Sequence, residues 1–186
     1  MGKIKIIKTP IQNLIVIEPQ IFGDERGFFF ESYNEKEFFD VGISDHFVQD
    51  NHSKSSRGVL RGLHFQTKHS QAKLVRVIKG TVFDVAVDMR RDSDTFGQWY
   101  GLILSEENKK VFYVPENFAH GFLTISEEAE FLYKVSDFYH PEFDAGILWD
   151  DPDIKVKWPF QEYRIKKEDL ILSEKDKNLP YLKDIL

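Results

Sequence analysis

Short apolar stretches, each closed by a turn signal, recur along most of the chain. The clearest two are Lys73–Lys79 and Thr81–Asp88, which are rich in Val and Ile and meet at a predicted tight turn, Lys79-Gly80. Further strands are predicted at Lys3–Lys8, Leu14–Glu18, Gly27–Ser32, Trp99–Leu104, Lys110–Val114, Gly121–Ile125 and Glu130–Val135. Many short strands between turns are typical of a β-sandwich or barrel.

Helix signals are few and short. Asn34 followed by Glu37 has the spacing of a capping box, and Gly42 suits the end of that helix. Ser173 is the second predicted cap, with Asp176 in the first turn of its helix. The chain has 186 residues and no internal repeat or linker. We therefore predict one all-β domain, residues 1–186, with a few short peripheral helices.

Composition excludes several classes of function. The chain has no cysteine, so disulfides and thiolate metal sites are excluded, and we expect a cytoplasmic location, with which this is compatible. The net charge of -6 argues against a nucleic-acid partner held by a broad basic face. No apolar run approaches the ~20 residues of a membrane span. The N-terminal alternation of Lys and Ile predicts a strand rather than a signal peptide.

The segment Arg61-Gly62-Leu63-His64-Phe65-Gln66 combines an arginine with a histidine. Alternate side chains of a strand point to opposite faces, so Arg61 and His64 meet only through a bend, which Gly62 permits. Arginine binds phosphate well, and histidine exchanges protons near neutral pH. With a second histidine, His120, the segment suggests proton transfer on a phosphorylated ligand. A hydrogen-bonded structural histidine is the alternative.

A catalytic metal is not expected. A cupin metal site needs a His-x-His pair, a carboxylate and a later histidine, but here the pair is broken as His64-Phe65-Gln66. Only His64 and His120 remain in matching places, whereas catalytic zinc sites use three protein ligands.

Two further polar groups have open interpretations. If Lys79-Gly80 closes a two-residue hairpin, Val75 lies opposite Asp84, and Lys73 becomes a diagonal neighbour of Asp84. This pair indicates either a polar cavity or a solvent-facing ion pair. Tyr133 could serve as a general acid or simply pack at a strand end, as could Tyr139. Asp176 could stabilise the N-terminus of its helix through the helix dipole, or it could orient His64.

Motifs in order along nearly the whole chain resemble those of the dTDP-4-dehydrorhamnose 3,5-epimerase family. They are Asp24 to Phe29, Gln49-Asp50-Asn51, Arg57 to Gln66, Lys73 to Val77, Phe83 to Asp88, Pro115 to Phe122, Trp149 to Pro152 and Leu172 to Asp176. The resemblance implies a cupin-type jelly roll, a homodimer, and neither metal nor cofactor. It also implies inversion of C3 and C5 in a dTDP-linked 4-keto-6-deoxy sugar.

The resemblance also implies residue roles. His64 matches the base, Asp176 its partner, Lys73 the cation near the ketone oxygen and Tyr133 the acid on the opposite face. Tyr139 matches the aromatic that stacks on thymine, and Asp84 could position Lys73. Phosphate contacts fall to Arg61 and to Arg26 of the partner subunit. Other substrate contacts match Glu31, Gln49, Asp50, Asn51, His120 and Lys175. Asp144 stands where some members have glutamate, which puts its contact in doubt.

Three alternatives remain open at this point. An epimerase acting at only C3 or C5 would use the same base and enolate. A metal-dependent cupin would need a bound ion for activity. A non-catalytic module that binds sugar nucleotides would keep Arg61 and the aromatic residues but would have no use for His64.

Overall fold

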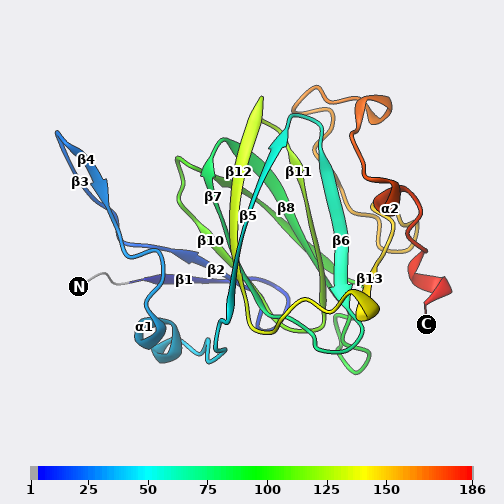
Figure 1. Ribbon diagram of the computed structural model, residues 1–186, viewed down its shortest axis with the longest axis horizontal. Coiled ribbons are helices and arrows are strands. Elements are labelled where there is room, and N and C mark those ends of the chain that lie inside the picture. The colour runs from blue at the N-terminus through cyan, green and yellow to red at the C-terminus, as the bar shows by residue number, and fades with distance from the viewer. Residues whose placement is uncertain (1–3, 186) are drawn as a thin grey trace.

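Two antiparallel sheets form the body of the molecule in the computed structural model, which describes residues 4–185 (Figure 1). The six-stranded sheet runs β1 (Lys5–Lys8), β2 (Ile15–Glu18), β10 (Val111–Val114), β7 (Lys73–Lys79), β12 (Glu128–Val135) and β5 (Gln49–Ser56). The five-stranded sheet runs β13 (Asp144–Gly146), β6 (Leu60–Gln66), β11 (Phe118–Thr124), β8 (Thr81–Asp88) and β9 (Trp99–Ser105). The predicted all-β, cupin-type jelly roll is confirmed.

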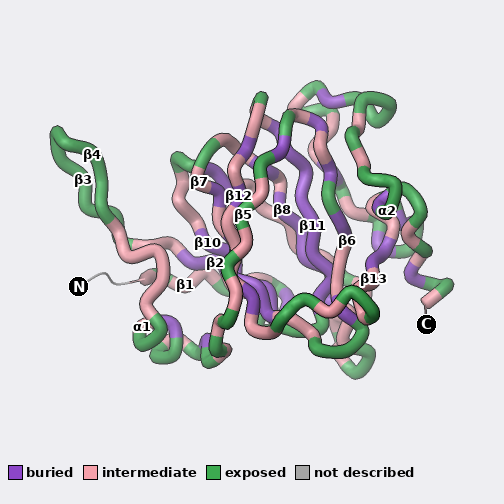
Figure 2. Tube along the Cα trace, viewed as in Figure 1, coloured by how far each residue is buried: buried purple, intermediate pink, exposed green. Residues whose placement is uncertain are grey.

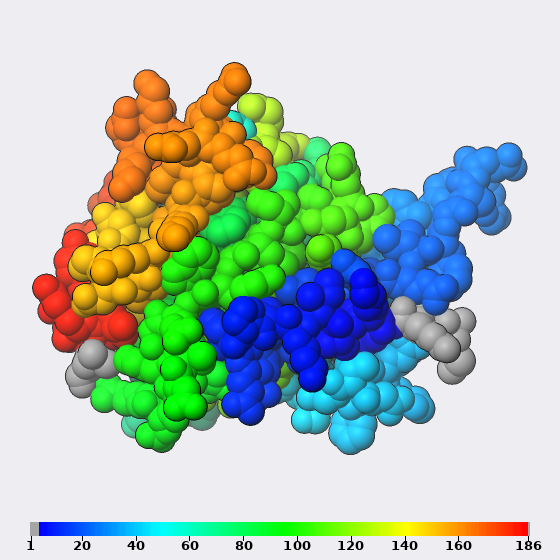
Figure 3. All heavy atoms as spheres, turned by 180° about the vertical axis from the view of Figure 1, so that it is seen from behind, coloured from blue at the N-terminus to red at the C-terminus, as the bar shows by residue number. Residues whose placement is uncertain are grey.

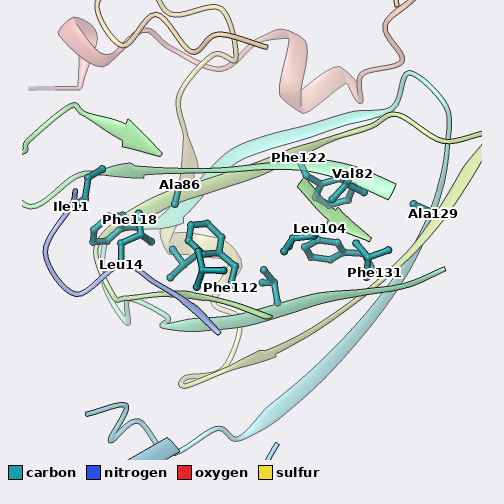
Figure 4. Packing of buried hydrophobic residues seen from close by; sticks show 14 residues of the cluster. Ile11, Leu14, Val82, Ala86, Leu104, Phe112, Phe118, Phe122, Ala129 and Phe131 are labelled. Carbon is teal, nitrogen blue, oxygen red and sulfur yellow. The ribbon is translucent and has the colours of Figure 1, made fainter. Parts of the chain in front are cut away.

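The interior between the sheets is filled by apolar side chains from both of them (Figure 4). Strand β8 shows how the pattern arises. Val82 and Ala86 point into this interior, while Val85 and Val87, on either side of Ala86 in the sequence, pack against the outer layer. A strand covered on both faces is buried at most of its positions, as Figure 2 shows for β11.

The outer layer is the segment that follows β13. Its apolar residues cover the outside of the five-stranded sheet and include Ile147, Ile154, Trp158, Ile165 and Leu182. The layer contains the short helix α2 (Glu174–Lys177) and the 3-10 turns Lys167–Asp169 and Leu182–Asp184; a third 3-10 turn, Pro141–Phe143, precedes β13. A parallel bridge between Val59 and Ile171 lies beside the start of β6 and brings α2 next to this strand.

The predicted hairpin between Lys73–Lys79 and Thr81–Asp88 is wrong in its pairing, although both strands have the predicted bounds. β7 pairs with β10 and β12, and β8 pairs with β9 and β11, so the turn at Gly80 carries the chain from one sheet to the other. Lys73 and Asp84 are nevertheless close enough for their charges to interact, because both are buried between the sheets. Of the two interpretations of this pair, the buried polar one is therefore correct. The two residues meet because the sheets pack on each other, not because their strands form a hairpin.

Most other predicted elements are confirmed with small shifts at their ends. The predicted strand Lys3–Lys8 corresponds to β1, and Lys3 itself lies outside the described residues. Asn34 accepts a hydrogen bond from the Glu37 amide and begins α1 (Glu35–Asp40), and Ser173 begins α2. The prediction omitted β5 because its sequence, QDNHSKSS, has no apolar residue. This edge strand is held by pairing with β12 along its full length.

A two-stranded arm, β3 (Phe22–Asp24) and β4 (Gly27–Phe29), projects from the six-stranded sheet and stands clear of the body (Figures 1 and 3). Its apolar side chains lack cover, with Phe28 61% and Phe29 67% exposed. Large exposed apolar groups on one projection mark a surface for contact. Within residues 4–185, no helix has the length and apolar character needed to cross a membrane.

Candidate active site

A cavity of about 450 Å³ opens between the two sheets, within the size range of small-molecule sites. The six-stranded sheet contributes side chains from β5, β7 and β12, and the five-stranded sheet contributes residues of β6, β11 and β13. The lining residues are Gln49, Asn51, Ser53, Arg61, His64, Phe65, Gln66, Gln71, Lys73, His120, Gly121, Phe122, Phe131, Tyr133, Tyr139, Asp144 and Lys175. Many of them are polar although the site lies between sheets, which indicates a binding site rather than core.

A bulge in β6 brings Arg61 and His64 to the same side of the strand. From Arg61 to His64 β6 advances three residues, while its partner β11 advances only two, from Phe122 to His120. Gly62 sits in this bulge with φ +104°, a region that suits glycine. The predicted bend is confirmed, and both side chains line the cavity.

His64 is held by a buried carboxylate. Its Nε2 lies 2.5 Å from Asp176 Oδ1, and the other carboxylate oxygen accepts a hydrogen bond from the Ser173 hydroxyl. Burial raises the pKa of Asp176, but the bonds to His64 and Ser173 outweigh it, so the pKa is lowered. An ionised Asp176 makes Nε2 the donor and leaves His64 Nδ1 as the nitrogen that can accept a proton.

A second histidine–carboxylate pair lies next to the first, with its histidine on the neighbouring strand β11. His120 stands opposite His64 in the β6–β11 register, and its Nε2 lies 2.8 Å from Asp84 Oδ1. Asp84 is fully buried behind His120 and does not line the cavity. Burial raises the pKa of Asp84, opposed by His120 and Lys73. Burial also lowers the pKa of Lys73 to about 8, against the pull of Asp144 and Asp84. The cavity thus holds a cation at neutral pH.

Tyr133 faces the cavity from the opposite sheet to His64. It lies between Asn51 on β5 and Val75 on β7, on the inner face of the six-stranded sheet. Burial raises the pKa of its phenol, and Arg61 partly opposes this, so Tyr133 stays protonated at neutral pH. A ligand between the sheets would therefore have a proton acceptor on one face and a proton donor on the other.

Polar groups for binding surround these residues. The Arg61 guanidinium is positioned by hydrogen bonds to the Ser55 hydroxyl and the Lys54 carbonyl. Tyr139, 53% exposed, donates its hydroxyl proton to Asp144, and Lys175 pairs with the same carboxylate.

The structure does not bring every predicted residue to the cavity. Arg26 lies on the arm, Asp50 pairs with Lys134, and Glu31 is hydrogen-bonded by Asn34 outside the lining. Asp84 and Asp176 are hydrogen-bonded to His120 and His64 and do not line the cavity themselves. Seven lining residues are not among the predicted ones: Ser53, Phe65, Gln66, Gln71, Gly121, Phe122 and Phe131. Alternation along β5 and β12 points to Ser53 and Phe131 once Asn51 and Tyr133 are placed.

Together, a jelly roll with a histidine–aspartate pair, a buried lysine and a facing tyrosine defines a protein that can move protons at carbon next to a carbonyl. Residues 8–184 match the model of the family described as dTDP-4-dehydrorhamnose 3,5-epimerase. The chain is also 53% identical to the enzyme of that name from Methanothermobacter thermautotrophicus, over 99% of this chain and 97% of the relative. The chain belongs to the dTDP-4-dehydrorhamnose 3,5-epimerase family, as its motifs suggest.

Solved structures agree with this membership. The epimerase from Elizabethkingia anophelis is 53% identical and superposes with a TM-score of 0.90, covering 97% of each chain. A second, from Legionella pneumophila in complex with dTDP-4-keto-L-rhamnose, is 50% identical with a TM-score of 0.92, covering 98% of this chain and 95% of that one.

Burial of Lys73 predicts a stability effect that is separate from activity. Its pKa falls from 10.5 in the unfolded chain to about 8 in the folded protein. As the pH drops from 10.5 to 8, the unfolded chain therefore binds a proton before the folded protein does, and the free energy of unfolding decreases. At pH 7, Lys73→Met should raise the free energy of unfolding by about 3 kcal/mol. Urea unfolding of both proteins between pH 7 and pH 10.5 checks this, and their difference should shrink as the pH rises.

The matched control is Lys157→Met, because Lys157 is exposed. This variant should stay within about 0.5 kcal/mol of the parent protein. If Lys73→Met is no more stable than Lys157→Met at pH 7, burial does not penalise the Lys73 charge.

Proposed function

We propose that the protein converts dTDP-4-dehydro-6-deoxy-D-glucose into dTDP-4-dehydro-L-rhamnose by inverting C3 and C5. The observation that carries this proposal is the placement of His64 and Tyr133 on opposing sheets around one cavity that also holds Lys73. The Legionella pneumophila relative, solved with dTDP-4-keto-L-rhamnose, supports the substrate class.

The first step removes a proton from the carbon beside the C4 ketone. His64 Nδ1 takes the proton, the C–H electron pair moves into a carbon–carbon double bond, and the carbonyl oxygen becomes an enolate. The ionised Asp176 stabilises the imidazolium that results. The Lys73 ammonium is buried, and it stabilises the enolate oxygen more strongly than a cation in water would.

The second step returns a proton to the same carbon from the other face. The Tyr133 hydroxyl donates it, the enolate collapses to the ketone, and the configuration is inverted. Because C3 and C5 both neighbour C4, one base and one acid can serve both centres in turn. Solvent then reprotonates Tyr133 and deprotonates His64, which restores the starting state.

The nucleotide part needs cations and a flat surface. Arg61 is the proposed phosphate contact, and exposed Tyr139 is the proposed stacking partner for thymine. Gln49, Asn51, His120, Asp144 and Lys175 are proposed as further contacts within the cavity. Asp84 is proposed to hold His120 and attract Lys73 rather than touch the sugar.

We also propose a homodimer in which the arm of one subunit reaches its partner. Arg26 lies at the tip of the arm, away from the cavity of its own chain, so it could contact the phosphates only in a second copy. The exposed Phe28 and Phe29 would be buried by that contact. Glu31 and Asp50 both lie outside the cavity lining. They remain proposed substrate contacts, at the place where the two subunits meet. The proposed location is the cytoplasm.

The reaction in deuterated water tests substrate, chemistry and number of centres together. With dTDP-4-dehydro-6-deoxy-D-glucose we expect two solvent deuterons in the product, at C3 and C5, resolved by NMR and mass spectrometry. Incorporation at one carbon would contradict double inversion and identify a single-centre epimerase. No incorporation, with binding intact, would identify a sugar-nucleotide binding module instead.

A further inference from the structure

Three potential metal ligands meet outside the cavity, at its rim. His69, in the segment between β6 and β7, meets Asp137 and His140 from the segment after β12, and their ligand atoms all lie within 4.8 Å of one another. His69 Nδ1 is 3.2 Å from Asp137 Oδ2, and the two imidazole rings stack with centroids 4.2 Å apart. Among residues 4–185, this is the one cluster with such geometry.

Two cavity residues, Gln66 and Gln71, form hydrogen bonds to the backbone of the segments that carry the three side chains. The Gln66 amide donates to the carbonyls of His69 and Phe138, and its oxygen accepts from the His140 amide. Gln71 donates to the Asp137 carbonyl at 2.8 Å. The two segments are therefore fixed relative to each other by buried or half-buried glutamines, so their side chains do not meet by chance contact of free loops.

The electrostatic setting suits a cation. Asp137 Oδ1 accepts a bond from the Phe138 amide, which leaves Oδ2 directed at His69. Glu142 adds a second carboxylate 3.6 Å from His140 Nδ1. The Lys68 ammonium lies nearby, over the Phe143 ring, and the chain as a whole carries a charge of -6.

We propose that His69, Asp137 and His140 bind one divalent transition-metal ion of the Zn²⁺ type at the rim of the cavity. Two imidazoles and one carboxylate are a common zinc set, with water completing the tetrahedron. Ligands about 2.0–2.1 Å from zinc lie roughly 3.3 Å from one another, so the two stacked imidazole rings must turn until their lone pairs converge on the ion, and both side chains are exposed enough to do so. The histidines in the cavity are different, because His64 and His120 each face a separate carboxylate, Asp176 or Asp84, and among the described residues neither pair is joined by a third ligand.

The ion would join the segment before β7 to the segment that carries Tyr139. Tyr139 lies between Phe138 and His140 and lines the cavity. The site would thus brace the rim without taking part in proton transfer, and its existence does not depend on the proposed reaction.

Titration of metal-free protein with ZnCl₂ tests the site. By calorimetry we expect one ion per chain for the parent protein and at least about tenfold weaker binding for His69→Asn/His140→Asn. The matched control is His46→Asn/His52→Asn, because these histidines each face only one carboxylate, Glu35 or Glu130. Equal binding by the His69/His140 variant, or no binding by the parent protein, would overturn the proposal.

A second measurement separates the rim from the cavity. Co²⁺ in place of Zn²⁺ should give a visible absorption band that is lost in Asp137→Asn and kept in His64→Ala. Saturating Zn²⁺ should raise the melting temperature of the parent protein and not that of Asp137→Asn, because only the folded site binds the ion. Loss of the band in His64→Ala but not in Asp137→Asn would place the metal in the cavity and contradict the proposal.

Discussion

Replacing His64 by alanine should lower kcat by about 10³-fold or more while substrate binding stays nearly unchanged. The imidazole lines the cavity and is paired with the buried Asp176, and binding rests on Arg61 and the other polar residues of the lining. The measurements are deuterium incorporation from solvent during a single turnover and calorimetric binding of dTDP. Asp176→Asn should also slow exchange, because a neutral amide can no longer stabilise the imidazolium.

His46→Ala is the control, since His46 is exposed and lies on the segment after α1. It should exchange protons at the parent rate. If His64→Ala retained exchange at C3 or C5, another residue would be the base, and His120 with its Asp84 partner would be the next to replace.

The second large effect is expected at Gly121, which lies where β6 and β11 come closest. A Cβ there would lie 2.4 Å from the Arg61 carbonyl oxygen and 3.1 Å from Gly62 Cα. Gly121→Ala should therefore force the strands apart and lower the free energy of unfolding by about 3 kcal/mol. Because the bulge positions both Arg61 and His64, activity should fall about 10²-fold as well. Urea unfolding and the exchange assay measure the two effects.

Gly23→Ala provides the comparison, since its Cβ would meet nothing nearer than 3.6 Å and no positive φ is involved. Its stability should match the parent protein within about 0.5 kcal/mol. A stable and active Gly121→Ala would mean that β6 can move away from β11 without disturbing the site.

Apolar periodicity was enough to predict the strands that are buried between layers, such as β7 and β8. It could not predict β5, whose polar sequence carries no such signal and which forms by pairing with β12. Nor could it say which sheet each strand joins. A glycine turn permits a hairpin and a crossover equally, and here the packing of Val82 and Ala86 against the opposite sheet decides for the crossover.

The site was predictable in part for similar reasons. The bend at Gly62 and the spacing of Arg61 and His64 are local, so residue types alone indicated them. The approach of Asp176 to His64 spans 112 positions, so the residues left it open as one of two interpretations and the family resemblance indicated it. The lining role of Gln71 could not be predicted either, because this residue lies outside the strands and its place depends on the fold around it, whereas alternation along β12 indicates Phe131 once Tyr133 is placed.

The helix that delivers Asp176 lies in the outer layer and belongs to neither sheet. Most of the cavity wall and the support of the base are consequently encoded in different stretches of the chain. The strands supply most of the wall, whereas the covering segment supplies the carboxylate that holds His64 from behind and one wall residue, Lys175. Selection or design can therefore change how His64 is held through Ser173 and Asp176 while the strand residues of the wall stay the same.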